Sequence, residues 1–464
     1  MGNPMTEPIP HDVSLIADPI HHYIQFTVPQ SSPGSNEVTE KDLIDSPWLQ
    51  RLRYIYQLQS ARWVYPAAEH SRFQHSLGAM HLAGQYAKHV YPSLAQTVRD
   101  VPSLPYVEAL LRITALLHDV GHGPFCHFFD HHFLHRYGLS HEHVSQAIIR
   151  HEAGPQIKQV RRSPSGTLAD HETLDPEYVA FLILKKPDKQ NRRYPRWLQL
   201  LRPLIGGLFT ADNFDYVLRD SYMCGVAIGP VDIPRLIHYT LITPKGLTIH
   251  KNGLPALQMF LNARLYLYAN VYYHRTSRAI DLHLLEIFHE TMECIFPYNP
   301  LQHMHQYLRL TDWSLLETVR AWESSTNRKR RRIGEEWARV LGRHIKWKTA
   351  YSRVLTMRDC RPRGPAATPE KLESRIRQQL PRRLRGLTFR VDIASKDTRP
   401  FNVLNMGQFQ FYLYDPATGS VEKEKLQELL EFLPSQIVQL RIFAENHQAD
   451  AELATAVERV LHGR

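Results

Sequence analysis

The chain has 464 residues, 43% of them hydrophobic, which is enough for two or three domains with a large buried core. It contains no apolar run close to the roughly 18 residues of a membrane-spanning helix and no signal peptide at its start, so we expect neither membrane insertion nor export. Its four scattered cysteines are typical of free thiols in a reducing cytoplasm, and its net charge of +10 favours nucleotides, nucleic acids or acidic partners.

The first 40 residues are predicted to be an entry segment with strand character, because apolar and polar residues alternate over residues 24–28. From about Asp42 to Tyr56, apolar residues recur at three- and four-residue steps, which predicts a helix. Residues 155–176 are polar and rich in turn-forming residues, so we expect a surface insertion there. Further helices are predicted around residues 77–84, 110–117, 141–151, 175–185, 196–220 and 256–295.

The pattern changes near residues 361–365, where Arg, Pro and Gly alternate and indicate a linker. Beyond this linker, alternating segments at 388–393, 409–414 and 437–443 predict strands. The predicted fold class is mainly α, with a helical core and a small α+β C-terminal region. The predicted parts are an entry segment (1–40), a helical catalytic core (41–300), a basic helical extension (301–365) and the α+β region (366–464).

The pair His118-Asp119 ends an apolar segment and is followed by two glycines, Gly121 and Gly123. A carboxylate beside a buried helix is costly unless it is paired or bound to a metal, so the pair predicts two metal ligands at a helix end. His75 alone would be read as a packed or solvated histidine, and Asp212 alone as part of a solvated acidic face. The combination of all four is what points to a metal-dependent hydrolase.

Two imidazoles and two carboxylates suit iron, manganese, zinc, nickel or magnesium, without selecting one of them. A divalent ion held in this way lowers the pKa of water and neutralises charge at phosphorus. Histidines titrate near neutrality and can therefore transfer protons or hold phosphates. Three more of them follow closely in the sequence, at His122, His127 and His141.

In order and local context, residues 72–78, 118–130 and 212–220 resemble the HD-domain phosphohydrolases. The resemblance is greatest to the deoxynucleoside triphosphate (dNTP) triphosphohydrolases that carry a sterile-alpha-motif domain, and to microbial relatives that lack this domain. It includes residues 18–21 and 48–55 and resumes near Pro400 and residues 409–412, so it covers most of the chain. It implies an HD-domain helical core.

The resemblance also implies roles for individual residues. His75, His118, Asp119 and Asp212 would be the metal ligands. His127 would be the catalytic histidine, positioned by Asp130, while His122 and His141 would contact the α-phosphate region or transfer protons. The implied substrate-binding residues are Arg72 for phosphate, Gln57 and Leu58 facing the deoxyribose, Tyr216 and Asp220 along the sugar, and Tyr272.

Some positions depart from the family pattern. A lysine that follows the last metal ligand in the family is Asn213 here, and polar positions that contact base and phosphate are Tyr268 and Tyr273. The expected reaction is hydrolysis of a dNTP to a deoxynucleoside and inorganic triphosphate, with His127 helping to protonate the leaving 5′-oxygen. The resemblance further implies a dimer or tetramer and an allosteric nucleotide.

Two other functions remain open from the sequence. A dense basic run at residues 327–332 would most simply be a solvated helix face, but it also suits a nucleotide or a nucleic-acid strand. It motivates a phosphodiesterase or nuclease that acts on single-stranded nucleic acid. The third alternative is a non-enzymatic nucleotide sensor or nucleic-acid-binding protein, although the full set of ligands argues against a degenerate site.

Overall fold

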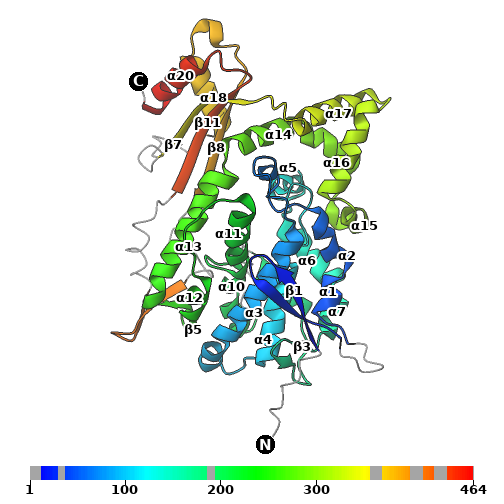
Figure 1. Cartoon of the computed structure of the whole chain (residues 1–464), viewed down its shortest axis with the longest axis vertical. Helices are drawn as coiled ribbons and strands as arrows, with labels where there is room; N and C mark the ends of the chain where they lie inside the picture. The colour runs from blue at the N-terminus through cyan, green and yellow to red at the C-terminus, as the bar shows by residue number, and fades with distance from the viewer. Residues whose placement is uncertain are drawn as a thin grey trace, which may run out of the picture.

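The computed structural model describes residues 12–29, 37–184, 194–355, 368–397, 411–422 and 436–462. The molecule is predominantly helical with a few small sheets, which confirms the predicted fold class. In Figure 1 the helical core occupies the lower and central part, and the small C-terminal unit lies at the top beside α14 (Arg275–Ile295). The predicted linker at residues 361–365 and part of the predicted strand at 409–414 lie outside the described residues.

The core helices follow one another along the chain with short connections. They are α1 (Glu40–Ile44), α2 (Pro47–Gln50), α3 (Arg72–Thr97), α4 (Leu104–Leu117), α5 (His127–His132), α6 (His141–His151), α7 (Gly154–Gln159), α8 (Pro176–Ile183), α9 (Arg196–Leu201), α10 (Pro203–Gly206), α11 (Ala211–Cys224), α12 (Ile233–His238), α13 (Leu254–Leu267), α14, α15 (Met304–Leu308), α16 (Asp312–Ala321) and α17 (Arg328–Leu341). The C-terminal unit adds α18 (Pro369–Gln379) and α20 (Asp450–His462).

The described residues also form four small sheets. Two are antiparallel pairs, β1 (Val13–Asp18) with β2 (His22–Thr27) and β3 (Arg162–Ser163) with β4 (Gly166–Thr167). The four-stranded sheet has the order β10 (Ser420–Glu422), β9 (Phe411–Asp415), β6 (Gly246–His250), β5 (Thr240–Thr243). The three-stranded sheet has the order β7 (Lys348–Leu355), β11 (Gln436–Ala444), β8 (Phe389–Asp397).

Helix α4 lies at the centre of the core and packs against α3, which also packs against α11. Every residue of α4 from Tyr106 to Leu117 is buried, as expected for a helix that is surrounded by other elements. Two of these buried residues are charged and are paired: Arg112 with Glu40 of α1, and Glu108 with Lys88 of α3. The three helices end or begin close to one another, which brings their terminal residues together.

Several predicted helices are shorter than their periodicity suggested. The helix expected from Asp42 to Tyr56 is divided into α1, α2 and a 3-10 turn, because Ser46 caps a new helix that starts at Pro47. The segment 196–220, expected to be one helix, forms the three helices α9, α10 and α11. Gly207 follows α10, and a Cβ there would lie 2.2 Å from the carbonyl oxygen of Pro203, so the chain turns closely at this glycine. The helix expected over 256–295 is interrupted by a π-helical turn (Tyr268–Tyr272).

Two segments take part in the core in ways that periodicity did not indicate. Residues 155–176 were expected to be a surface insertion, but β3 packs against α4, and Ile157, Val160 and Leu168 are buried. Strand β9 was expected to belong to the C-terminal unit, but it pairs in parallel with β6 of the core. Among the described residues, we find no helix with the length and apolar character to cross a membrane.

The buried pair between Glu40 and Arg112 gives a test of this packing. Both carboxylate oxygens of Glu40 accept from Arg112, at 2.5 and 2.9 Å, and the Thr27 amide donates to one of them. Replacing Glu40 by Ala leaves the buried guanidinium of Arg112 without its carboxylate partner, so we expect the free energy of unfolding to fall by about 3–5 kcal/mol in urea denaturation. The control Glu69→Ala removes an exposed partner of Arg62 and should cost about 0–1 kcal/mol. Equal losses in the two variants would contradict this account.

Candidate active site

The first predicted metal ligand lies on the opening turns of α3. Ser71 and Gln74 form a capping box that starts the helix just before the site. His75 is buried, and its Nε2 atom lies 3.2 Å from Asp212 Oδ1 and 3.8 Å from Asp119 Oδ2. The imidazole of α3 therefore faces the carboxylates of two segments that are distant in the sequence.

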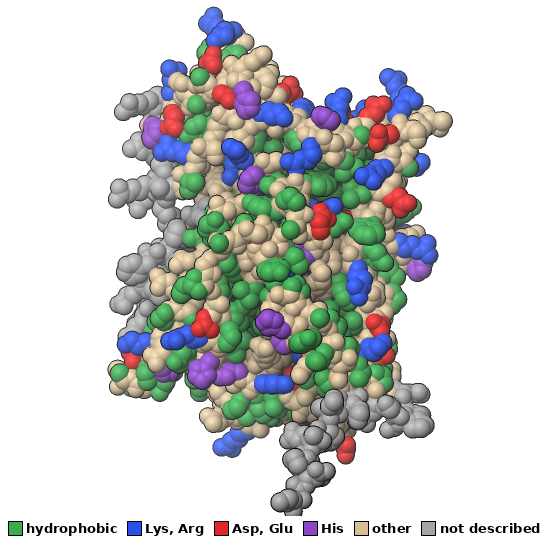
Figure 2. Space-filling model, viewed as in Figure 1, with side chains coloured by type: hydrophobic (Ala, Val, Ile, Leu, Met, Phe, Trp, Pro, Cys, Tyr) green, Lys and Arg blue, Asp and Glu red, His purple; other side chains and the backbone are tan. Residues whose placement is uncertain are grey.

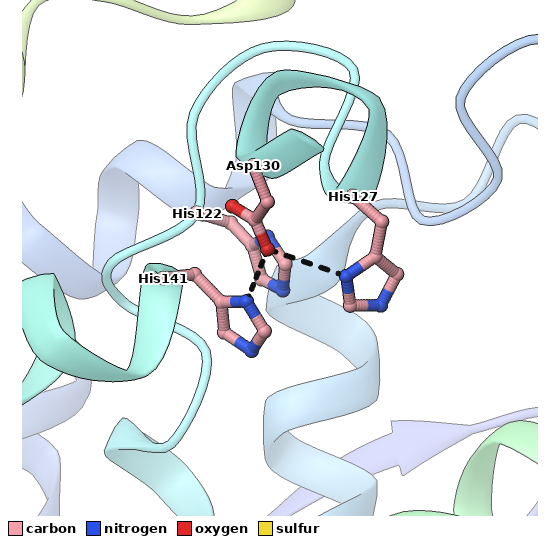
Figure 3. Close-up of side chains that lie close together, drawn as sticks. All are labelled: His122, His127, Asp130 and His141. Carbon is pink, nitrogen blue, oxygen red and sulfur yellow. Dashed lines mark hydrogen bonds and ion pairs between the residues drawn. The ribbon is translucent and has the colours of Figure 1, made fainter. Parts of the chain in front are cut away.

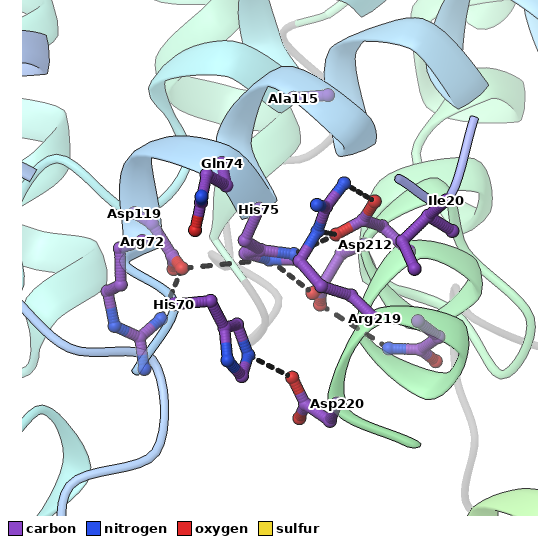
Figure 4. Close-up of polar contacts among 12 residues, drawn as sticks. Ile20, His70, Arg72, Gln74, His75, Ala115, Asp119, Asp212, Arg219 and Asp220 are labelled. Carbon is purple, nitrogen blue, oxygen red and sulfur yellow. Dashed lines mark hydrogen bonds and ion pairs between the residues drawn. The ribbon is translucent and has the colours of Figure 1, made fainter. Parts of the chain in front are cut away.

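The pair His118-Asp119 follows the last residue of α4. The Nδ1–H group of His118 donates to the carbonyl oxygen of Ala115 at 2.7 Å, which leaves Nε2 as the free acceptor atom. This Nε2 atom lies 3.3 Å from Asp119 Oδ1 and 3.8 Å from Asp212 Oδ1. Asp212 lies in the first turn of α11, which Thr210 caps. Three helix ends thus bring the four predicted ligands together, and Figure 4 shows His75, Asp119 and Asp212 converging.

The charges around these four residues favour a cation. Burial would raise the pKa of Asp119, but Arg72 and His118 hold this pKa well below its ordinary value. Burial would likewise raise the pKa of Asp212, but His118 and His75 hold it well below its usual range. Burial would lower the pKa of His75, yet hydrogen bonds to Asp212 and Asp215 raise it to about 10. The pocket therefore keeps two ionised carboxylates and attracts positive charge.

A second layer of side chains orients His75. Its Nδ1 atom lies 2.8 Å from Asp215 Oδ2. Arg219 donates to both oxygens of Asp215, at 2.9 and 2.8 Å, and His21 Nε2 lies 2.7 Å from Oδ1. A Cβ at Gly78 would lie 1.8 Å from Asp215 Oδ1, so only glycine leaves room for this carboxylate against α3. Such outer partners fix the ring orientation of a metal-binding histidine.

The four residues predicted to be catalytic form a second cluster beside the first (Figure 3). The carboxylate of Asp130 lies at its centre, hydrogen-bonded to His141 Nδ1 and 3.4 Å from His127 Nδ1. The ring of His122 stacks on that of His141, with centroids 3.8 Å apart. The side chain of His127 is 57% exposed, whereas Asp130 and His141 are buried. The exposed histidine is thus supported by a buried carboxylate.

His122 connects the two clusters. Its Nε2 atom lies 3.4 Å from Asp119 Oδ1, and neither ring nitrogen makes a hydrogen bond within the described part of the chain. Burial and the charge of Arg72 lower the pKa of His122 well below its ordinary value, so its ring is neutral. Buried polar atoms normally have partners. Together with the nitrogen and oxygen donors of the first cluster, this unsatisfied ring fits a divalent ion and its water or phosphate ligands.

Arg72 was predicted to bind phosphate, and in the structure its guanidinium group contacts two other side chains. Its Nη1 atom is hydrogen-bonded to Asp119 Oδ2, and its Nε–H group donates to Cys126 Sγ at 2.9 Å. The backbone next to this contact is strained, because Phe125 and Cys126 both have positive φ angles, 60° and 51°. Asp312 holds this turn by accepting from the amide of Phe125 at 2.9 Å.

Three of the predicted substrate-binding residues, Asp220, Tyr216 and Tyr272, are joined by contacts. Asp220 is buried and accepts from the hydroxyl of Tyr272 at 2.6 Å, and its second oxygen lies 2.9 Å from His70 Nε2. Tyr216 packs edge to face against Tyr272, with centroids 6.4 Å apart. Figure 4 shows the His70–Asp220 contact near His75. A cluster of polar and aromatic side chains therefore lies near the candidate metal centre.

The two residues predicted to face the deoxyribose differ in their surroundings. The Oε1 atom of Gln57 is buried and has no hydrogen-bond partner among the described residues, so it remains available to a ligand. The side chain of Leu58 is buried in the hydrophobic core. The packing of Leu58 therefore does not support its predicted contact with a sugar.

Sequence reasoning missed the residues that support the site. His70, His21, Asp215 and Arg219 had no predicted role, although Asp215 and Arg219 have the i, i+4 spacing of a helical ion pair. His21 lies just after β1, in the turn of a hairpin 194 residues before Asp215. No local pattern could have related these two residues.

Comparisons with known proteins agree with this geometry. Residues 72–198 match the HD domain, and residues 231–348 match the HD associated region. The chain is 28% identical over 329 residues to the uncharacterised protein YwfO of Bacillus subtilis, covering 67% of this chain and 66% of the relative. It is 28% identical over 306 residues to the deoxynucleoside triphosphate triphosphohydrolase SAMHD1 of Gallus gallus, covering 60% of this chain and 48% of that protein.

A crystal structure of a hypothetical protein from Aquifex aeolicus is also similar. Its TM-score is 0.69 at 25% sequence identity, and the match covers 96% of this chain and 100% of that one. By contrast, the chain spans just under two thirds of the Bacillus relative and about half of the chicken relative.

The support of His75 by Asp215 can be tested through metal affinity. Asp215→Asn presents an amide that cannot hold His75 and Arg219 as the carboxylate does, so we expect the affinity for Mn²⁺ to fall about 10- to 100-fold in isothermal titration. Asp45→Asn, which changes an exposed carboxylate, is the matched control and should bind like the unchanged protein. Unchanged affinity in Asp215→Asn, with the fold intact by circular dichroism, would refute the positioning role.

Proposed function

This chain belongs to the HD-domain family, and we propose that it is a hydrolase that converts dNTPs to deoxynucleosides and inorganic triphosphate. One observation carries the proposal. His122 lies between Asp119 of the four-donor centre and the ring of His141, which is hydrogen-bonded to Asp130. The candidate centre for a divalent ion therefore lies next to a histidine–carboxylate pair. Metal activation of water and proton transfer by histidine are the two contributions that hydrolysis of a phosphate ester uses.

The chain's own residues would divide the work in the following way. A bound divalent ion supplies activation of water and neutralisation of phosphate charge. His75, held by Asp215, and His118, held by the Ala115 carbonyl, present their Nε2 atoms to the ion. Burial around the site excludes bulk water and strengthens these electrostatic contacts.

His127 is the proposed acid for the leaving group. Its Nδ1 atom faces Asp130, which leaves Nε2 to carry a proton to the 5′-oxygen of the nucleoside. Burial raises the pKa of Asp130, but its neighbours His141 and His127 hold it well below its ordinary value. Burial, with the charges of His141 and Arg72, lowers the pKa of His127, and its contact with the ionised Asp130 opposes this shift.

The sugar would bind at the cluster of Asp220, Tyr216 and Tyr272. The buried Oε1 atom of Gln57 offers a further acceptor for a hydroxyl group. Asp220 is proposed to lie near the 3′-hydroxyl. Support for a dNTP as the substrate comes from the printed name of the chicken relative. A homo-oligomer and an activating nucleotide belong to the same proposal.

A second candidate function rests on the start of α17. Figure 2 shows Lys and Arg side chains projecting at the upper right, where Figure 1 places this helix. They would suit a phosphodiesterase that acts on single-stranded nucleic acid. However, Arg332 pairs with Glu290, and Lys329 lies 3.5 Å from Glu293, so part of this charge is already neutralised. The surface therefore favours the second candidate less than the site favours the first.

A panel of single dNTPs, single NTPs and their mixtures, with product identification, tests the proposal. We expect deoxynucleoside and inorganic triphosphate from dNTPs, and we expect His118→Ala with Asp119→Ala to abolish turnover, because half of the ligand set is lost. Removal of metal with a chelator should have the same effect. Shortened oligonucleotides without dNTP turnover would favour the second candidate, and full activity of the double variant would contradict a metal mechanism.

The role of His127 calls for a separate variant. His127→Ala keeps all four proposed ligands, so metal content should be unchanged while kcat falls about 10²- to 10⁴-fold through loss of proton transfer. The neighbouring His131→Ala alters an exposed histidine of the same helix and should leave kcat unchanged. Equal kcat values for the two variants would remove His127 from the mechanism.

A further inference from the structure

The sheet of the C-terminal unit has one apolar and one polar face. Leu440 and Ile442 of β11 belong to the hydrophobic cluster that includes α18 and α20. Side chains alternate along a strand, so Gln439 and Arg441 lie on the opposite face. The cross-strand partner of Arg441 is Asp392 of β8. Arg278 of α14 contacts Asp392, so this polar face meets the helical core.

Arg441 is buried at this seam without a full set of partners. Its side chain donates to Gln439, but its Nε and Nη1 atoms have no hydrogen-bond partner in the described residues. The residue is 5% exposed. The adjacent carboxylate of Asp392 is already held by Arg278, at 3.2 and 2.5 Å. A buried guanidinium without its own anion is strongly unfavourable.

The surroundings of Arg441 add more positive charge. Burial lowers the pKa of Arg441, Asp392 opposes this, and Arg278 and Arg275 lower it further. Burial also lowers the pKa of His274, and the charges of Arg275 and Arg441 lower it further. The other acid near Arg278 is Asp281, which already accepts from Ser60 at 2.6 Å. Within the part of the chain that the structure describes, the cations named at the seam (Arg275, Arg278 and Arg441) outnumber the carboxylates (Asp392 and Asp281).

We propose that this seam is a binding site for a phosphate-class anion, anchored by Arg441 and flanked by Arg278 and Arg275. The oxygens of phosphate accept from several directions, which suits guanidinium groups contributed by a strand and a helix. Arg275 is exposed, so the seam is open to solvent at this residue. The anion is either inorganic phosphate or the phosphate chain of a larger molecule.

The seam is connected to the cluster of polar and aromatic side chains described above. Gln439 Nε2 donates to the carbonyl oxygen of Ala269 at 3.2 Å, within the π-helical turn. The last residue of this turn, Tyr272, holds Asp220. An anion at Arg441 would steady the turn and with it this cluster. This consequence rests on the proposed function, whereas binding of the anion does not.

Thermal unfolding and titration with inorganic phosphate test the site. We expect phosphate to raise the Tm of the unchanged protein more than NaCl at equal ionic strength does. In Arg441→Gln, the affinity for phosphate should fall at least about tenfold, as expected for the loss of charge-assisted hydrogen bonds. Without phosphate this variant should be at least as stable as the unchanged protein, because a costly buried charge is gone. The control Arg99→Gln removes an exposed cation that follows α3 and should behave like the unchanged protein.

Two results would overturn the proposal. One is equal phosphate affinity in the unchanged protein and in Arg441→Gln. The other is a Tm of Arg441→Gln that lies below that of the unchanged protein by the same amount with and without phosphate. Arg441→Lys, which keeps the charge but removes donors, serves the same comparison if the glutamine variant does not fold. Titration with inorganic triphosphate distinguishes a free phosphate site from one for a phosphate chain. If the protein binds phosphate but does not hydrolyse dNTPs, the proposed function is refuted and the anion site remains.

Discussion

Asp215 is the residue on which the arrangement of the site depends. Its carboxylate has no exposure to solvent and contacts His75 of α3, Arg219 of α11 and His21 of the N-terminal hairpin. Burying a carboxylate costs several kcal/mol unless its oxygens are fully paired. These partners hold its pKa well below the ordinary value against the effect of burial, the charge of Arg219 foremost. The position of His75 thus follows from the need to satisfy one buried charge.

The same principle extends across the site. Asp119 is paired with Arg72, Asp130 with His141, and Asp220 with His70 and Tyr272. Each carboxylate is kept ionised or hydrogen-bonded by a group from another segment. A helical core stabilised by apolar packing alone would not need these contacts. These paired carboxylates are therefore fixed, buried charges, of the kind that a site for electrostatic catalysis would need.

The C-terminal unit meets the core through a polar seam as well as through apolar contact. Phe443 packs into the large hydrophobic core, whereas Asp392 and Gln439 make hydrogen bonds with Arg278 and Ala269. Such contacts are directional. In our proposal, an anion bound at Arg441 would act on Asp220 through this turn, without a large movement of domains.

The sequence by itself determined the helical class, through apolar periodicity. It predicted the four candidate ligands from the adjacent pair His118-Asp119 read together with His75 and Asp212. It also indicated strands at β8 and β11. It did not show the breaks at Pro47 and Gly207, because cap and contact geometry depend on neighbours. Only the tertiary structure decided that β9 joins the core and that Leu58 is buried in it. Likewise, only folding joined His21 to Asp215 and left two nitrogens of Arg441 without a hydrogen-bond partner among the described residues. These relations exist between segments that meet in space and leave no local pattern.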